Sequence, residues 1–207
     1  ISGSQIIIND FTGNKITFLD PASQSADETA YRVIASPLEN SFTGSFAVDS
    51  DDNIWYTNWQ FRQGGALIKF DQKSYFEASA LAKDAGVPLF DFIKVFQLPS
   101  MNAPNGISVG NDGLVWIADT SSSFFYSFDP SSEKFTKYIT SKPDISSYGN
   151  ATGLIKTPVS GPYWADFDQK GRLVFNEQSA NRIGIFDPST ESLVEYNVPS
   201  KNPIWAD

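Results

Sequence analysis

Oxygen-bearing side chains at the ends of apolar segments are the residues of this sequence best suited to chemistry. Four short segments rich in β-branched and aromatic residues each end in such a side chain, namely Asp10, Asn58, Asp119 and Glu177. Carboxylate and amide oxygens are the ligands that Mg²⁺ and Ca²⁺ take in proteins. Because equivalent strands around one axis bring their ends together, we predict a divalent-metal site formed by these four residues. Asn105 is predicted to face the same space and to bind ligand, and Trp59 to line a ligand-binding rim.

A structural role for these side chains stays open beside the metal site. Side chains of this kind also cap strand ends or hydrogen-bond turn backbone, and they recur in many folds built from repeated units. The sequence has no His and no Cys. It therefore lacks the commonest general base near neutral pH, the commonest metal ligand and any thiolate. A serine nucleophile has no histidine partner for a catalytic triad.

A repeated turn indicates which elements must position these residues. An aspartate follows an apolar residue at four places, Asp20, Asp71, Asp129 and Asp187, with spacings of 51, 58 and 58 residues. Small polar residues follow, and aspartate in such a setting favours a tight turn by bonding its own backbone. A segment typical of a buried strand precedes each turn, and a further apolar strand precedes three of these buried strands. After the turn comes a strand in which apolar and polar residues alternate, as in residues 135–139. Each repeat is thus predicted to be a four-stranded antiparallel meander.

This period predicts an all-β fold, a β-propeller of four-stranded antiparallel blades, and argues against a β-sandwich. We expect one propeller over residues 1–207, with repeat units at about 1–44, 45–104, 105–160 and 161–202. The first unit lacks its first strand, and residues 203–207 begin a new blade. These amount to about 3.5–4 blades. Residues 203–207 could pair with the first unit and close a four-bladed ring. A six- or seven-bladed ring of which this chain is part is favoured, because the sequence stops within a strand.

Two longer segments interrupt the repeats. Residues 74–91 include a helical stretch at 77–83, and residues 141–158 are rich in Ser, Gly and Pro. Both are expected to enlarge the rim of one loop-rich face, where binding sites tend to lie. The tryptophans Trp55, Trp116, Trp164 and Trp205 recur at two repeat positions, which favours packing between blades for them.

Segments 53–57, 113–119 and 176–187 resemble the repeat of streptogramin (virginiamycin B) lyase-like propellers, a pattern that shades into NHL and gluconolactonase-like propellers. The last segment matches best, with Asn-Arg-Ile-Gly at 181–184 ahead of an Asp-Pro turn. The resemblance implies a seven-bladed ring and a Mg²⁺-assisted site near the central channel. It also implies a lyase that opens a cyclic depsipeptide at an ester with a catalytic His. Glu177 stands where the repeat places its glutamate, whereas no residue here matches the family's His.

Two functions are therefore kept open. The first is a non-catalytic module that binds a protein or small-molecule ligand on the loop-rich face, and the second is a Mg²⁺-dependent C–O lyase or lactonase-like hydrolase acting on a cyclic ester. The net charge of −9 argues against nucleic acid as a partner. No stretch approaches the roughly 18 apolar residues of a membrane helix. We expect an extracytoplasmic or secreted location, and a missing chain segment or a partner that closes the ring.

Overall fold

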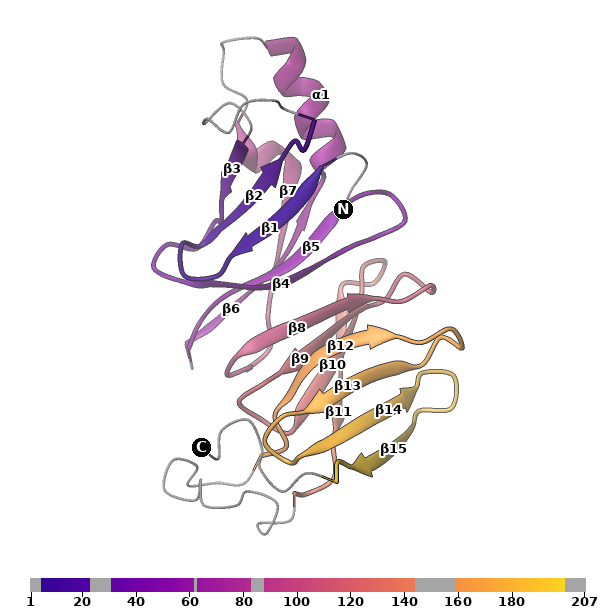
Figure 1. Cartoon of the computed structure of the whole chain (residues 1–207). Coiled ribbons are helices and arrows are strands. Elements are labelled where there is room, and N and C mark those ends of the chain that lie inside the picture. Colours follow the sequence, from indigo (N-terminus) through magenta and orange to yellow (C-terminus); the bar gives the residue numbers. More distant parts are fainter. Residues whose placement is uncertain (1–4, 23–30, 62, 83–87, 144–158, 200–207) are drawn as a thin grey trace. The chain divides into compact units, whose positions relative to one another are not determined.

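The computed structural model describes residues 5–22, 31–61, 63–82, 88–143 and 159–199 (Figure 1). In this part of the chain, strands predominate, with one α-helix and one short 3₁₀-helix between them. The chain divides into two compact units, Ile1–Leu98 and Pro99–Asp207. Each unit holds two sheets whose strands follow one another in chain order, as antiparallel meanders do.

The first unit contains a three-stranded sheet, sheet I, and a four-stranded sheet, sheet II (Figure 1). Sheet I consists of β1 (Ile6–Asp10), β2 (Lys15–Leu19) and β3 (Tyr31–Ala35). Sheet II consists of β4 (Phe42–Val48), β5 (Ile54–Gln60), β6 (Gly64–Phe70) and β7 (Ile93–Gln97). Within the described residues, sheet I has three strands, as expected for a first repeat without its first strand. The predicted unit boundary between residues 44 and 45 falls inside β4.

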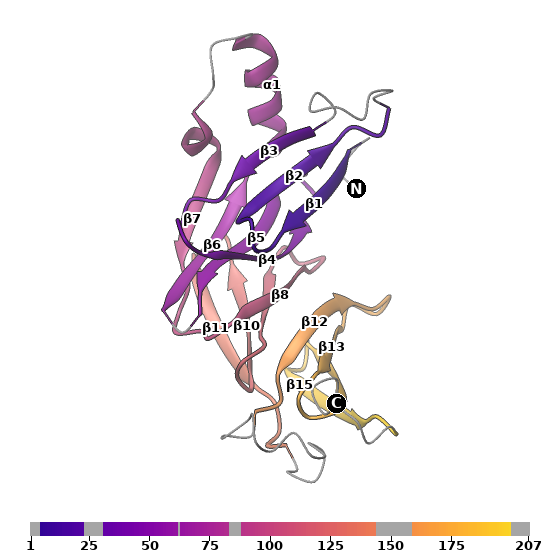
Figure 2. The same cartoon turned by 60° about the vertical axis from the view of Figure 1, so that its left-hand side comes forward.

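The second unit contains two four-stranded sheets, sheets III and IV (Figure 2). Sheet III consists of β8 (Pro104–Val109), β9 (Val115–Asp119), β10 (Phe124–Asp129) and β11 (Lys134–Ile139). Sheet IV consists of β12 (Pro162–Phe167), β13 (Leu173–Glu177), β14 (Arg182–Asp187) and β15 (Ser192–Asn197). These meanders confirm the predicted antiparallel blades of a β-propeller.

Local turn chemistry explains the hairpins that join these strands. The Asp129 carboxylate accepts hydrogen bonds from the backbone N–H and the hydroxyl of Ser131, at 2.8 and 2.7 Å. Asp187 and Ser189 repeat this arrangement at 2.9 and 2.6 Å. The predicted aspartate turn is therefore present in both repeats of the second unit.

The aspartate of the second repeat has a different role, because a helix follows it. Asp71 Oδ1 accepts a hydrogen bond of 3.0 Å from the backbone N–H of Ser74, which caps α1 (Gln72–Ala82). The 3₁₀-helix η2 (Leu89–Phe92) then leads into β7. The helix begins five residues before the predicted stretch at 77–83, because an Asp N-cap in front of helix-compatible residues starts a helix as readily as a turn.

The first unit is built on an aromatic and aliphatic core between sheets I and II. Ile16, Phe18, Tyr56 and Phe70 are almost fully buried in it. Phe18 meets Phe76 of α1 edge-to-face at a centroid distance of 5.0 Å, so the helix covers one end of this core. Apolar burial on this scale supplies most of the free energy that holds the sheets together.

The second unit has an equivalent core between sheets III and IV. Trp116 and Phe125 of sheet III pack there with Phe175 and Phe186 of sheet IV. The ring centroids of Phe125 and Phe175 lie 5.0 Å apart. The predicted packing between blades holds for Trp116, which contacts sheet IV and is 1% exposed; Trp55 is equally buried, whereas Trp164 is 64% exposed and Trp205 lies outside the described residues. None of the helices in the described segments is long and apolar enough to span a membrane.

Candidate functional site

Asn58 near the end of β5 is fully buried, and both the oxygen and the nitrogen of its side-chain amide form hydrogen bonds. Its Oδ1 accepts a hydrogen bond from the backbone N–H of Leu38 at 2.8 Å. Its Nδ2 donates to Asn14 Oδ1 and Ser41 Oγ, both at 2.7 Å. Asn58 thereby joins the β1–β2 turn and the β3–β4 connection to sheet II, which is the structural role that the sequence left open for it.

Asp119 occupies the equivalent position at the end of β9 and is 1% exposed. Its carboxylate accepts hydrogen bonds from the backbone N–H of Asn102 at 3.1 Å and of Ala103 at 2.7 Å. These bonds hold the segment that leads into β8. Burial, with a smaller contribution from the negative charge of Asp119, raises the pKa of the neighbouring Tyr126 to about 12.

Glu177 at the end of β13 has a side chain long enough to reach a charged partner. Its Oε2 accepts hydrogen bonds from Arg182 Nη2 at 2.6 Å and Arg182 Nε at 3.2 Å. Arg182 Nη2 also donates to the Ser141 carbonyl at 2.8 Å and lies 3.5 Å from Glu195 Oε1. Glu177 Oε1 is buried without a hydrogen-bond partner in the described structure. Burial raises the pKa of Glu177 to about 7, although the hydrogen bond and charge of Arg182 favour the carboxylate.

Asp10, the fourth predicted ligand, is exposed and ends β1. Its Oδ1 accepts a hydrogen bond of 2.9 Å from the Gly13 N–H, which closes the β1–β2 turn. Asp10 and Asn58 lie in the first unit, and Asp119 and Glu177 in the second. Over the described residues, no group of three or more His, Cys, Asp or Glu side chains is placed to hold a metal ion. The four-residue metal site stays a prediction.

The two predicted ligand-binding residues have local partners. Asn105 is half-buried, and its Nδ2 donates to Thr120 Oγ1 at 3.3 Å. Trp59 is 4% exposed, and its ring lies 5.4 Å from that of Phe42 and 6.1 Å from that of Phe11, between centroids. Its buried indole N–H has no hydrogen-bond partner among the residues described. Trp59 is therefore the inner member of an aromatic cluster that reaches the surface at Phe11, which is 40% exposed.

Relative to the candidate residues Asn58 and Asp119, the two insertions leave their own sheets at opposite ends. In sheet II, β6 ends at Phe70, away from the end that holds Asn58, so α1 follows at the opposite end. In sheet III, β11 ends at Ile139, which stands level with Asp119 across β10. The second insertion therefore starts at the end that holds the candidate residue. Most of it, residues 144–158, lies outside the described residues.

A cleft that the sequence did not predict lies at the end of the second unit opposite to Asp119 and Glu177. It has a volume of about 320 Å³ and is formed by the β8–β9, β12–β13 and β14–β15 turns. Its lining residues are Asn111, Asp112, Phe167, Lys170, Gly171, Asp187, Pro188 and Ser189. The turn residues were recognisable from the sequence, but nothing in it indicated that three turns would surround one space.

The described strands match those of known propellers. A catalytically inactive virginiamycin B lyase from Staphylococcus aureus, with a His replaced by Ala and in complex with quinupristin, has a TM-score of 0.65 at 19% identity. The match covers 97% of this chain and 54% of the lyase chain, so this chain spans about half the length of that enzyme.

Two propellers of other kinds are also similar. An auxiliary nutrient binding protein from Bacteroides thetaiotaomicron has a TM-score of 0.54 at 13% identity, over 93% of this chain and 38% of that one. The extracellular domain of a putative one-component system from the same species has a TM-score of 0.58 at 13% identity, over 98% and 22%. No protein-family model and no curated protein sequence matches this chain. At these identities the similarity shows the fold, a streptogramin-lyase-like β-propeller, and it confirms the predicted resemblance.

Proposed function

We propose that this chain is a non-catalytic β-propeller module that binds a small polar ligand. The observation that carries the proposal is the role of two of the strand-end residues that the sequence predicts as metal ligands. Asn58 and Asp119 are buried, and their side chains form hydrogen bonds with backbone and side-chain groups of their own units. Residues engaged in this way stabilise the sheets, and because both are buried they do not present their polar atoms to a substrate in solution.

The cleft of the second unit offers a place for the ligand. Its volume of about 320 Å³ lies at the lower end of the range for small-molecule sites. Phe167 supplies an apolar surface, Lys170 an ammonium group, and Asp112 and Asp187 carboxylates. A compact ligand that carries both an amino and an acidic group would satisfy this mixed lining.

Two of the similar structures support a binding role. One is a nutrient binding protein and another is an extracellular domain, so propellers of this shape serve binding as well as lyase chemistry. The extracellular neighbour is also compatible with the extracytoplasmic location expected from the sequence, which we keep as part of the proposal. The fold alone does not select among functions, and the argument therefore rests on the residues.

The binding proposal is tested by ligand-observed NMR with a panel of free amino acids, amino sugars and dicarboxylates. We expect at least one zwitterionic member to bind with millimolar or better affinity, and Lys170→Ala to abolish its signal. Lys134→Ala is the matched control, because Lys134 is an exposed lysine at the same end of sheet III and outside the cleft. If no panel member binds, or if both variants bind alike, the cleft is not the site.

One observation favours the second function, a Mg²⁺-dependent lyase or lactonase. Glu177 combines a buried carboxylate oxygen that lacks a partner in the described structure with a pKa raised to about 7. A carboxyl group that titrates near neutral pH is suited to general acid–base catalysis, and a free oxygen can bind a metal ion.

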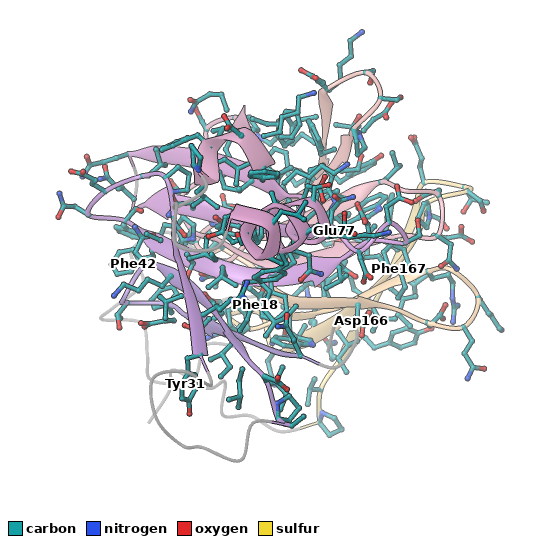
Figure 3. All side chains as sticks on the ribbon, turned by 90° about the horizontal axis from the view of Figure 1, so that it is seen from above. Phe18, Tyr31, Phe42, Glu77, Asp166 and Phe167 are labelled. Atoms are coloured by element: carbon teal, nitrogen blue, oxygen red, sulfur yellow. The ribbon has the colours of Figure 1, made fainter. Side chains whose placement is uncertain are left out.

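The enzyme function is tested by incubating the chain with quinupristin and millimolar Mg²⁺ and following ring opening by mass spectrometry. The binding proposal expects no product. Product that disappears in Glu177→Gln and persists in Glu77→Gln, an exposed residue of α1, would establish the enzyme function in its place (Figure 3).

A further inference from the structure

Three turns of the chain share one backbone hydrogen bond, and one of them lacks a side chain that the other two use. The turns are β4–β5, β8–β9 and β12–β13. In each, one residue donates its backbone N–H to the carbonyl oxygen of the residue four positions later. That residue is Asp49, Gly110 or Asp168, and the bond is 3.0, 2.9 or 2.9 Å long. The β8–β9 turn therefore has a glycine where the equivalent turns have an aspartate.

The two aspartates use both oxygens of the carboxylate. Asp49 Oδ1 and Asp168 Oδ1 accept hydrogen bonds from turn backbone, namely from the N–H of Asn53 at 2.9 Å and of Arg172 at 3.0 Å. The second oxygen accepts a hydrogen bond from a side chain. Asp49 Oδ2 accepts from Trp55 Nε1 at 2.8 Å, and Asp168 Oδ2 accepts from Arg172 Nη2 at 2.6 Å. A carboxylate at this position thus satisfies the turn and one side-chain donor.

In the β8–β9 turn, only the first of these two roles is filled. Asp112 Oδ1 accepts a hydrogen bond of 3.1 Å from the backbone N–H of Leu114. The side-chain donor is present, because Trp116 stands six residues after Gly110, the interval that separates Trp55 from the aspartate of its own turn. Trp116 is 1% exposed, and its buried indole N–H has no hydrogen-bond partner in the described structure. A buried donor without an acceptor costs free energy, so a group that supplies the acceptor is bound more tightly.

The two indole rings have the same setting in their sheets. Trp55 stacks on Phe96 of β7 at an interplanar angle of 18°, and Trp116 stacks on Tyr138 of β11 at 26°. Phe96 and Tyr138 hold equivalent positions, each level with the residue two places after the tryptophan. We therefore place the Trp116 N–H at the turn that precedes its strand, as the Trp55 N–H is.

This point borders the cleft of the second unit. A Cβ atom built on Gly110 would lie 3.1 Å from Phe167 Cζ and 2.5 Å from Asp112 Oδ1. Asp112 and Phe167, which Figure 3 labels, both line the cleft, together with Lys170. A group that enters the cleft beside Gly110 thus stands where an aspartate side chain would stand, and an ammonium group belongs to the same lining.

We propose that the cleft binds an α-amino acid whose carboxylate takes the place of the side chain missing at Gly110. The inference names the ligand class of the site under "Proposed function" and rests on that function. The carboxylate accepts a hydrogen bond from Trp116 Nε1 and pairs with the Lys170 ammonium group, and the amino group of the ligand pairs with Asp112. Hydrogen bonds between charged groups are the stronger ones, so both ends of the ligand contribute to binding.

The two carboxylates of the lining explain why the ligand is an amino acid. A simple carboxylate beside Gly110 would be repelled by Asp112, whose Oδ1 stands close to that point, and by Asp187. An ammonium group on the carbon next to the carboxylate offsets this repulsion. An amine without a carboxylate would face the Lys170 ammonium group and leave the Trp116 N–H unpaired. The side chain of the ligand lies against Phe167.

The first test compares derivatives of one amino acid by ligand-observed NMR. The free amino acid that binds most tightly is measured beside its amide and its N-acetyl derivative. The amide lacks the carboxylate and the acetyl derivative lacks the ammonium group, so each should bind at least about tenfold more weakly.

The second test follows the indole N–H of Trp116 in proton–nitrogen correlation spectra of the chain. The same amino acid should move this resonance downfield, because the N–H gains an acceptor, and leave that of Trp55 in place. Trp116→Phe keeps an aromatic ring but not the donor, and it should weaken binding by at least about tenfold. Trp55→Phe is the matched control and should bind as the wild type does, because the Trp55 indole bonds Asp49 outside the cleft.

Gly110→Asp supplies the carboxylate from the chain itself. It should move the Trp116 resonance downfield without ligand, and it should weaken amino-acid binding by at least about tenfold, because the position is filled. Gly110→Ala is the control, since it adds a Cβ atom without an acceptor and should not move the resonance downfield. Circular dichroism melts confirm that each variant folds.

The outcomes separate this inference from the proposed function. If an amino acid binds and Lys170→Ala abolishes its signal, but the Trp116 resonance stays in place, the inference is overturned and the binding function stands. The same conclusion follows if the amide binds as tightly as the free amino acid, or if only amino sugars or dicarboxylates bind. If no compound of the panel binds, the binding function and this inference are both overturned.

Discussion

The buried carboxyl group of Glu177 is expected to make stability depend on pH. Its pKa is raised from 4.5 to about 7 in the folded chain. Between these two pH values the folded state keeps a proton that the unfolded state has released. The free energy of unfolding therefore falls as the pH rises. The stabilising contribution is complete below pH 4.5 and is lost as the pH passes about 7.

The size of the effect follows from the pKa difference between the two states. The pKa of Glu177 differs by about 2.5 between the folded and unfolded states. At about 1.36 kcal/mol per pKa unit, this difference corresponds to about 3 kcal/mol of stability. It already contains desolvation of the carboxylate, which raises the pKa, its attraction to Arg182 at 2.6 Å, which lowers the pKa, and the interaction with Glu195, which raises it. Glu177→Gln keeps the shape of the side chain and an oxygen acceptor for Arg182, but it does not titrate. The wild type should therefore lose about 3 kcal/mol relative to this variant between pH 4.5 and pH 8.

Urea unfolding of both proteins in steps from about pH 4.5 to pH 8.5 measures this difference directly. Carboxylates outside the cluster of Glu177, Arg182 and Glu195 cancel in the comparison, and Asp129, whose pKa is lowered to about 2 by hydrogen bonds from Ser131 and Ser132, titrates outside the window. Glu191→Gln is the control, because Glu191 is exposed. If the stability of the wild type relative to Glu177→Gln stays constant or rises with pH, the reasoning is refuted. The Arg182 ion pair would then outweigh burial and keep Glu177 charged.

Two substitutions test the packing of the sheets. Asn58→Ala leaves the backbone N–H of Leu38 and its other partners unpaired in the interior, and should lower the free energy of unfolding by about 3 kcal/mol in urea; a loss below about 1 kcal/mol would contradict a structural role. Gly106→Ala places a Cβ 1.8 Å from the Tyr163 carbonyl oxygen, so β8 and β12 must separate. It should destabilise the chain by at least about 3 kcal/mol, against about 1 kcal/mol for Gly113→Ala, where only the positive φ opposes a side chain; equal losses would show that close approach is unimportant.

Local features were predictable from the sequence because they depend on neighbouring residues. Three of the strands end at the residues predicted from the sequence, Asp10, Asp119 and Glu177, since β-branched and aromatic runs favour extended backbone. The Asp129 and Asp187 turns form as predicted, because the aspartate bonds residues only two or three positions away. The same local signal failed at Asp71, where the residues that follow it decide between a turn and a helix.

Tertiary contacts decided the roles of side chains that look equivalent in the sequence. Trp55 and Trp116 occupy the same repeat position, but only Trp55 has an acceptor, Asp49 Oδ2 at 2.8 Å. The corresponding turn residue in sheet III is Gly110, and the buried indole N–H of Trp116 has no hydrogen-bond partner in the described structure. Similarity between repeats therefore predicts position in a blade but not the partner of each polar atom.

The sequence by itself determined the repeated four-stranded meander, its turns and the exclusion of histidine and cysteine chemistry, because these follow from residue type and short spacing. Only the tertiary structure decided that Asn58 and Asp119 stabilise the sheets, that Glu177 pairs with Arg182, and that three turns enclose a cleft. It also decided which of the described side chains on each sheet are buried and which are exposed. Burial and hydrogen bonding join residues far apart in the chain, and strand alternation marks two faces without saying which of them another sheet covers.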